Sequence, residues 1–148
     1  YCAKITPRLY KAVTEGSLKG KVKLFFRPFP IKSHEGSIEG GLAMETAASL
    51  GYFWPFVNLM YERYEQFCPN LLSTWIEKDL KKDKAAFETT MQDTKTRTAL
   101  IASKQEGINN KVNSTPTLFI NGTEYVYNLS EGVLEGVLEE AYEIATAK

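Results

Sequence analysis

A short β-hairpin is the feature that most limits how this chain can fold. Residues 117–120 (TLFI) and 123–127 (TEYVY) are two β-rich runs separated by Asn121-Gly122. Asn-Gly between such runs is the strongest short-range hairpin signal, because both turn residues must take positive φ. Any fold proposed for this chain must therefore contain an antiparallel pair of strands in its C-terminal part.

A second strand is predicted near the start of the chain. Residues 21–29 (KVKLFFRPF) alternate Val22, Leu24 and Phe26 with mostly charged neighbours, and Pro28 and Pro30 end the run. Strict alternation over such a length is typical of a half-buried strand.

Helical periodicity dominates the rest of the sequence. Residues 2–13 carry apolar side chains on one helical face, and residues 37–50 repeat the pattern. Further helices are predicted after Pro55 as far as Pro69, over 71–80, from Asp83, from Asp93 to Gly107 and from Ser130 onward. Asp83, Asp93 and Ser130 are the expected N-caps, and Gly107 is the expected αL terminator. The element order is helix, strand, several helices, hairpin and helix.

Composition excludes several classes of protein. The chain has 148 residues, 43% of them hydrophobic, which is enough for one domain with a core. Its 18 basic and 18 acidic residues give no net charge, so we expect no binding to nucleic acid or to an acidic membrane surface. No apolar run approaches the ~20 residues of a membrane span, and no leader-like segment is seen.

The inventory of metal ligands and thiols is small. Two cysteines and one histidine exclude a disulfide framework, a four-cysteine zinc site and most histidine-based metal sites. Cys68 is predicted to be a buried structural thiol, and a disulfide with Cys2 has no support in the sequence. His34, the only histidine, is predicted to cap or pack. On local grounds alone, the sequence favours an inert helix cysteine at Cys2 over a reactive one.

Pro116 stands immediately before the first hairpin strand, and two interpretations of it are open. A trans proline at the first position of a strand is tolerated. A cis bond after Thr115 costs only about 0.5–1 kcal/mol more than trans and would leave the Thr115 backbone free to face a partner chain.

Four segments resemble the DsbA-like branch of the thioredoxin-fold proteins, and together they cover essentially the whole chain. Residues 115–122 (TPTLFING) resemble the family's TPT-F-x-NG loop. Residues 26–35 (FRPFPIKSHE) resemble a strand that ends in a proline-rich turn, and residues 43–59 (AMETAASLGYFWPFVNL) resemble the helical insertion. Tyr1-Cys2 resembles the end of a Cys-x-Tyr-Cys motif.

The resemblance implies roles for four residues. Cys2 corresponds to the resolving cysteine, and the nucleophilic cysteine would lie three positions earlier, ahead of Tyr1. Pro116 corresponds to the family's cis-proline, Thr115 to a residue that contacts the substrate chain, and Tyr1 to a further substrate-binding position. No metal and no organic cofactor is implied.

The resemblance also implies an α/β, thioredoxin-like fold with a helical insertion. We expect a single DsbA-like domain over 1–148, with 1–30 and 111–148 as the thioredoxin-like part and 37–109 as the insertion. The family's first strand, which lies centrally in the sheet, is absent from the sequence. We therefore expect a fragment of a longer protein, or another segment that fills the gap, since buried amides would otherwise be unsatisfied.

The function implied is thiol:disulfide exchange with cysteines of protein substrates, in the periplasm or elsewhere outside the cytoplasm, with a redox partner protein and no membrane insertion. Four aromatic side chains are expected to pack the helical part: Phe53, Trp54, Phe56 and Trp75. The resemblance also implies that some exposed apolar side chains line a groove for unfolded peptide. Two alternatives stay open. One is a redox-inactive binding domain on the same fold, and the other is a glutathione-dependent isomerase or transferase. The residues upstream of Tyr1 would distinguish all three.

Overall fold

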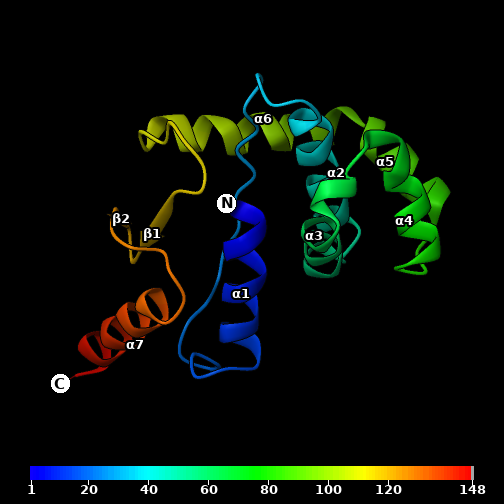
Figure 1. The fold of residues 1–148 in the computed structure, drawn as a ribbon. Helices are drawn as coiled ribbons and strands as arrows, with labels where there is room; N and C mark the ends of the chain where they lie inside the picture. Colours follow the sequence, from blue (N-terminus) through cyan, green and yellow to red (C-terminus); the bar gives the residue numbers. More distant parts are fainter. Residues whose placement is uncertain (148) are drawn as a thin grey trace. The chain divides into compact units, whose positions relative to one another are not determined.

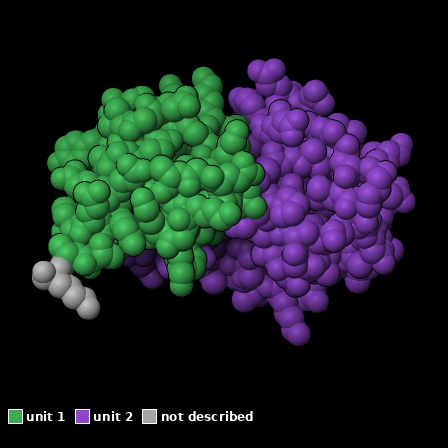
Figure 2. Space-filling model, turned by 90° about the horizontal axis from the view of Figure 1, so that it is seen from below, with its two compact units in different colours: residues 1–26, 114–148 green, residues 27–113 purple. Residues whose placement is uncertain are grey.

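A computed structural model describes residues 1–147, which form two compact units (Figure 2). Unit 1 joins Tyr1–Phe26 with the chain from Ser114 onward, and unit 2 is the continuous segment Arg27–Asn113. Each unit is described separately below. The single DsbA-like domain predicted from the sequence, with its 37–109 insertion, stays a prediction.

Unit 1 contains two helices and the hairpin (Figure 1). Helix α1 spans Cys2–Thr14, strands β1 and β2 span Leu118–Ile120 and Thr123–Tyr125, and helix α7 spans Val133–Thr146. The strands pair antiparallel, with Ile120 opposite Thr123. Asn121 and Gly122 both take positive φ, of 49° and 85°. The hairpin predicted from the Asn-Gly turn is confirmed.

The core of unit 1 is a small apolar cluster shared by segments distant in sequence. Ile5 and Leu9 of α1 and Leu134 of α7 are its buried members. Partly buried side chains from the segment after α1, from the hairpin, from the loop that follows it and from α7 pack against it: Leu24, Leu118, Ile120, Tyr125, Leu129 and Leu138. Because Ile5 and Leu9 stand four residues apart, they lie on one helical face, and this face is what joins α1 to the hairpin.

The strand predicted over residues 21–29 is wrong. The segment is extended and keeps its alternation, since Val22, Leu24 and Phe26 are half-buried while Phe25 is 72% exposed. Strand assignment requires a hydrogen-bonded neighbour, however, and within residues 1–147 this segment is paired with none. Alternation predicted which side chains turn inward but could not supply a neighbouring strand.

Unit 2 is helical. Its helices are α2 (Ser37–Ser49), α3 (Phe53–Glu62), α4 (Leu72–Lys78), α5 (Lys84–Gln92) and α6 (Thr94–Asn109), with short 3₁₀ turns η1 (Tyr64–Gln66) and η2 (Pro69–Leu71). Helix α2 packs against α3, α5 and α6. Its Gly-Gly-Leu-Ala-Met stretch, residues 40–44, is buried throughout, and Phe56, Ile76 and Phe87 of the neighbouring helices are fully buried.

Two of the predicted helix caps are confirmed. The Asp83 carboxylate accepts a hydrogen bond from the Ala86 amide at 3.0 Å, and the Asp93 carboxylate accepts one from the Lys95 amide at 2.9 Å. Each carboxylate satisfies a backbone donor that the helix itself leaves free.

The two other predicted helix ends are wrong. The N-cap of α7 is Gly132, not Ser130, and the Glu135 carboxylate accepts the Gly132 amide at 2.9 Å. Gly107 lies inside α6, which continues to Asn109. A Cβ at Gly107 would come within 2.5 Å of the Phe29 ring. This glycine therefore admits a neighbouring side chain and does not terminate the helix.

Candidate functional site

Cys2 is the first residue of α1. Tyr1 is the N-cap, and its carbonyl accepts the amides of Lys4 and Ile5 at 3.0 and 3.1 Å. The first turn carries no acidic side chain, so the positive end of the helix dipole faces its surroundings without a neutralising carboxylate on the helix itself. Cys2 is a free, half-buried thiol, and the Tyr1 side chain is 90% exposed.

Thr115 and Pro116 lie on the loop that leads into β1. Both are half-buried, and the peptide bond between them is cis. The Thr117 hydroxyl donates to the Ser114 carbonyl at 2.6 Å and so closes the turn locally. The structure thus has the cis form of the two interpretations left open by the sequence.

One apolar cluster fixes both segments of the candidate site. Cys2 stands three residues before Ile5, and Pro116 stands two residues before Leu118, and both Ile5 and Leu118 belong to the cluster of unit 1. The cluster therefore positions the start of α1 and the Pro116 loop within the same unit. No hydrogen bond or ion pair among residues 1–147 joins Cys2 directly to Thr115 or Pro116.

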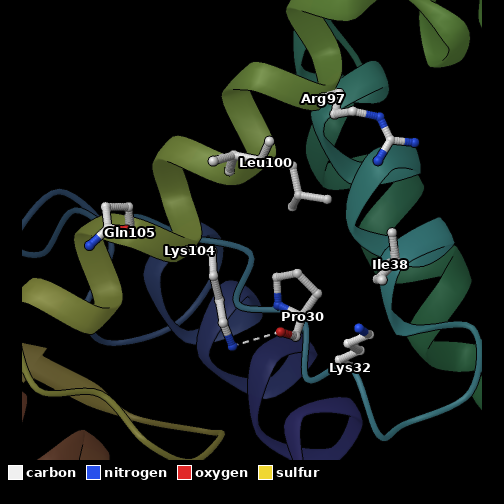
Figure 3. A pocket seen from close by; sticks show the side chains of 8 residues that line it. Pro30, Lys32, Ile38, Arg97, Leu100, Lys104 and Gln105 are labelled. Carbon is white, nitrogen blue, oxygen red and sulfur yellow. Dashed lines mark hydrogen bonds between the residues drawn. The ribbon is translucent and has the colours of Figure 1, made fainter.

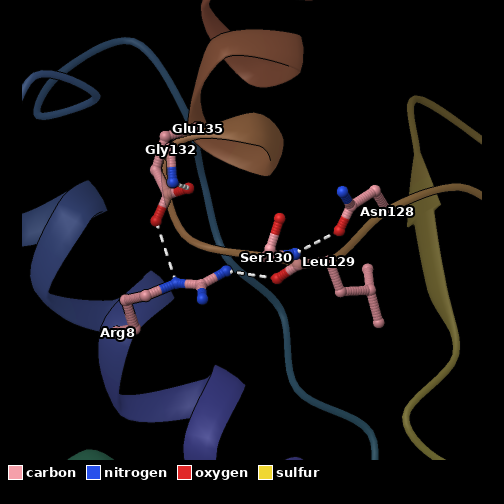
Figure 4. A network of polar contacts seen from close by, with 6 residues as sticks. All are labelled: Arg8, Asn128, Leu129, Ser130, Gly132 and Glu135. Atoms are coloured by element: carbon pink, nitrogen blue, oxygen red, sulfur yellow. Dashed lines mark hydrogen bonds and ion pairs between the residues drawn. The ribbon is translucent and has the colours of Figure 1, made fainter.

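A polar network around Arg8 adds a second connection between α1 and the C-terminal part of unit 1 (Figure 4). Arg8 Nη2 donates to the Leu129 carbonyl at 2.7 Å, and Arg8 Nε lies 3.0 Å from Glu135 Oε1. The two side chains are only 23% and 18% exposed. The other carboxylate oxygen of Glu135 accepts the Gly132 amide, so one side chain both caps α7 and pairs with α1.

Sequence reasoning missed this network. Arg8 and its carbonyl partner are separated by 121 residues, and an arginine in an amphipathic helix is by default a solvated residue. The one local signal was the acidic residue in the first turn of α7, which is typical of a helix N-terminus.

The remaining thiol and the histidine lie in unit 2. Cys68 is a free, half-buried thiol at the N-cap position of η2, less buried than predicted. His34 is exposed, and only its backbone takes part in the turn, where its carbonyl accepts the Ser37 amide at 3.1 Å. The predicted capping or packing role of the His34 side chain is wrong.

Residues 1–147 contain neither a metal-binding cluster nor a membrane-spanning helix. No three His, Cys, Asp or Glu side chains there gather in a way that could hold a metal ion. No described helix is both long and apolar enough to cross a bilayer.

The described chain is rich in helices, has a small two-stranded sheet and carries a cysteine at the first residue of a helix. Comparison with known families identifies its class as thioredoxin-like, because the model of the thioredoxin family matches residues 1–140. The chain belongs to the thioredoxin family. No curated protein and no solved structure matches it.

Proposed function

We propose that this protein is a DsbA-like thiol:disulfide oxidoreductase that acts on cysteines of protein substrates outside the cytoplasm. The observation that carries the proposal is the position of Cys2, a free and partly accessible thiol at the first residue of α1 in a chain of the thioredoxin family. A helix N-terminus favours negative charge, and the thiolate is the reactive form of cysteine.

The proposed reaction uses Cys2 as the resolving cysteine and a nucleophilic cysteine three positions before it, ahead of Tyr1. The nucleophilic thiolate attacks one sulfur of a substrate disulfide, forms a mixed disulfide and releases one substrate thiolate. The Cys2 thiolate then attacks the mixed disulfide and releases the second substrate thiolate. The substrate gains two electrons and the enzyme's own pair becomes a disulfide, which a redox partner protein reduces. Run in reverse, the same steps oxidise a substrate dithiol.

The loop before β1 is proposed to hold the substrate beside the redox pair. By resemblance to the family, Pro116 lies beside the redox pair, and Thr115 and Tyr1 contact the substrate chain. The 90% exposure of Tyr1 and the anchoring of Leu118 to the cluster below α1 support this assignment. The helical unit Arg27–Asn113, which interrupts the sequence of unit 1, supports the DsbA-like subclass.

The test is mixed-disulfide trapping with the full-length protein. Cys2→Ala should accumulate a mixed disulfide with a peptide that contains a disulfide bond, detected by mass spectrometry, because the first attack releases one peptide thiolate and the resolving attack is lost. Turnover in insulin reduction should fall to background in the same variant.

Cys68→Ala is the matched control. It removes the other free thiol, which lies in unit 2, and should leave trapping and turnover unchanged. Full insulin-reducing activity in Cys2→Ala would refute the resolving role. A residue other than cysteine three positions before Cys2, together with no activity, would favour a redox-inactive binding domain instead. A serine at that position would favour glutathione-dependent chemistry.

A further inference from the structure

Unit 2 contains a hollow between α6, the start of α2 and the segment around Pro30 (Figure 3). Its volume is about 270 Å³, close to the lower end of ordinary small-molecule sites. Arg97, Leu100, Ile101 and Lys104 stand at i, i+3, i+4 and i+7 of α6, so they share one face of this helix. The hollow therefore has a wall built from a regular element.

The apolar part of the lining is partly open to solvent. Pro30, Ile38, Leu100 and Ile101 supply it. Ile38 is 37% exposed and Ile101 is 61% exposed, although Leu100 is buried. Figure 3 shows Pro30, Ile38 and Leu100 around the same space. Apolar side chains left exposed around a concavity are the common lining of a ligand site.

The charged part of the lining is entirely basic. Arg97, Lys32 and Lys104 contribute, and no acidic side chain does. The Lys104 ammonium is already engaged, since it donates to the Pro30 carbonyl at 2.7 Å and lies 3.4 Å from the centroid of the Phe29 ring. The side chains of Arg97 and Lys32 form no ion pair or hydrogen bond with another residue in the described chain. The hollow thus offers two cations without a protein partner.

The polar groups of the lining favour a ligand with a single anionic head over a peptide main chain. Pro30 has no amide hydrogen, and its carbonyl already accepts from Lys104. The backbone groups of α6 are used within the helix. Gln105 also lines the hollow, but its side-chain nitrogen already donates to the Asn109 side chain at 2.9 Å. An extended peptide would therefore bring amide groups that find few partners here, and burying them unpaired is costly.

We infer that this hollow binds an amphipathic monocarboxylate, a straight acyl chain with one carboxylate head. The apolar tail lies against Ile38, Leu100 and Ile101, and Arg97 pairs with the head, because a guanidinium can donate to both oxygens of a carboxylate. Lys32 adds attraction at the rim. The inference concerns unit 2 alone and is independent of the redox chemistry proposed for Cys2.

The test is an NMR titration of the full chain with decanoate, held below its micelle concentration, with decanol as the uncharged analogue. We expect decanoate to shift the amide signals of residues 97–105 and 38, and decanol to bind at least about tenfold more weakly, as the loss of charge-assisted hydrogen bonds implies. Arg97→Gln should weaken decanoate binding by a similar factor, whereas Lys95→Gln, the same charge change on α6 away from the lining, should not.

A second pair of variants tests the tail. Ile101→Glu places a carboxylate against the acyl chain and should abolish binding. Because Ile101 is 61% exposed, the variant should stay folded, which its amide spectrum would report. Ile108→Glu is the control, since Ile108 is 50% exposed on the same helix but outside the lining. Equal binding of decanol and decanoate, no effect of Arg97→Gln, or tighter binding of a short acidic-apolar peptide would each overturn the inference.

Discussion

The close approach of Phe29 to α6 predicts that replacing Gly107 with alanine will destabilise unit 2. A Cβ at this position would lie 2.5 Å and 2.6 Å from the Cδ2 and Cε2 atoms of the Phe29 ring. The ring has little freedom to move away, because Lys104 Nζ lies 3.4 Å from its centroid. The residues on both sides of Phe29 are also hydrogen-bonded to α6 through their carbonyls.

The expected magnitude is a balance of two opposing effects. Alanine in place of glycine inside a helix stabilises it by about 1 kcal/mol. Inserting a methyl group into occupied space costs about 1–3 kcal/mol. The free energy of unfolding should therefore fall by up to about 2 kcal/mol in Gly107→Ala. Gly136→Ala in α7 is the matched control, because nothing lies within 4 Å of its added Cβ, and it should stabilise unit 1 by about 1 kcal/mol.

Urea unfolding measures both effects. Tryptophan fluorescence reports on unit 2, since Trp54 and Trp75 are the only tryptophans and both lie there, and far-UV circular dichroism reports on the whole chain. In a Phe29→Ala background the obstacle is removed, so Gly107→Ala should become stabilising. The double-mutant cycle should give a coupling of about 1–3 kcal/mol between the two positions.

One result would refute this reasoning directly. If Gly107→Ala stabilises unit 2 as much as Gly136→Ala stabilises unit 1, and the cycle with Phe29→Ala shows no coupling, the ring does not occupy the space that the glycine leaves.

Three other predictions concern single side chains. Ser103→Ala leaves the Pro28 carbonyl without its buried donor, now at 2.7 Å, and should lower the free energy of unfolding by about 1–3 kcal/mol. Arg8→Met removes the ion-pair partner of the half-buried Glu135 carboxylate. It should lower the free energy of unfolding, measured by thermal unfolding, by about 1–3 kcal/mol. The pKa of Glu45 is raised above its ordinary 4.5 by burial, against an opposing attraction to Arg27. The contribution of Glu45 to the free energy of unfolding is therefore fully present at low pH and is lost as pH rises from 4.5 through the raised pKa. Glu45→Gln should be more stable than the wild type at neutral pH and equally stable near pH 4.

Each of these variants has a control on the same helix. Each control makes a corresponding change at an exposed residue. Thr98→Ala is the control for Ser103→Ala, and Lys11→Met is the control for Arg8→Met. Glu39→Gln is the control for Glu45→Gln. Equal effects in a variant and its control would show that the named contact contributes nothing specific. For Glu45, a stability difference that does not change between pH 4 and pH 7 would contradict the burial effect.

The sequence predicted the elements whose causes are local. The hairpin follows from the backbone preferences of Asn121-Gly122, and the starts of α5 and α6 follow from carboxylates at Asp83 and Asp93 that reach amides two or three residues away. The presence of the helices of unit 2 follows from the spacing of apolar residues within each helix, but the helix predicted as far as Pro69 is wrong at its end, because α3 stops at Glu62. None of these requires knowledge of another part of the chain.

Features that depend on distant residues could not be predicted in the same way. Gly107 has the local appearance of a helix terminator, and only the Phe29 ring shows why a glycine stands there. The extended segment 21–29 has the alternation of a strand, but pairing depends on a neighbour. The four residues assigned to the candidate site came from family resemblance, and their grouping depends on an apolar cluster whose members span most of the sequence.

The division of the chain has a consequence for the order of events during synthesis. Unit 2 is continuous and is complete once Asn113 has left the ribosome. Unit 1 is interrupted, and α1 must wait for Leu134 before its apolar face can be covered. Because domains generally fold as units while the chain is made, the helical unit can form first. The apolar face of the N-terminal helix, which carries Ile5 and Leu9, is then the part of the nascent chain that stays uncovered for longest.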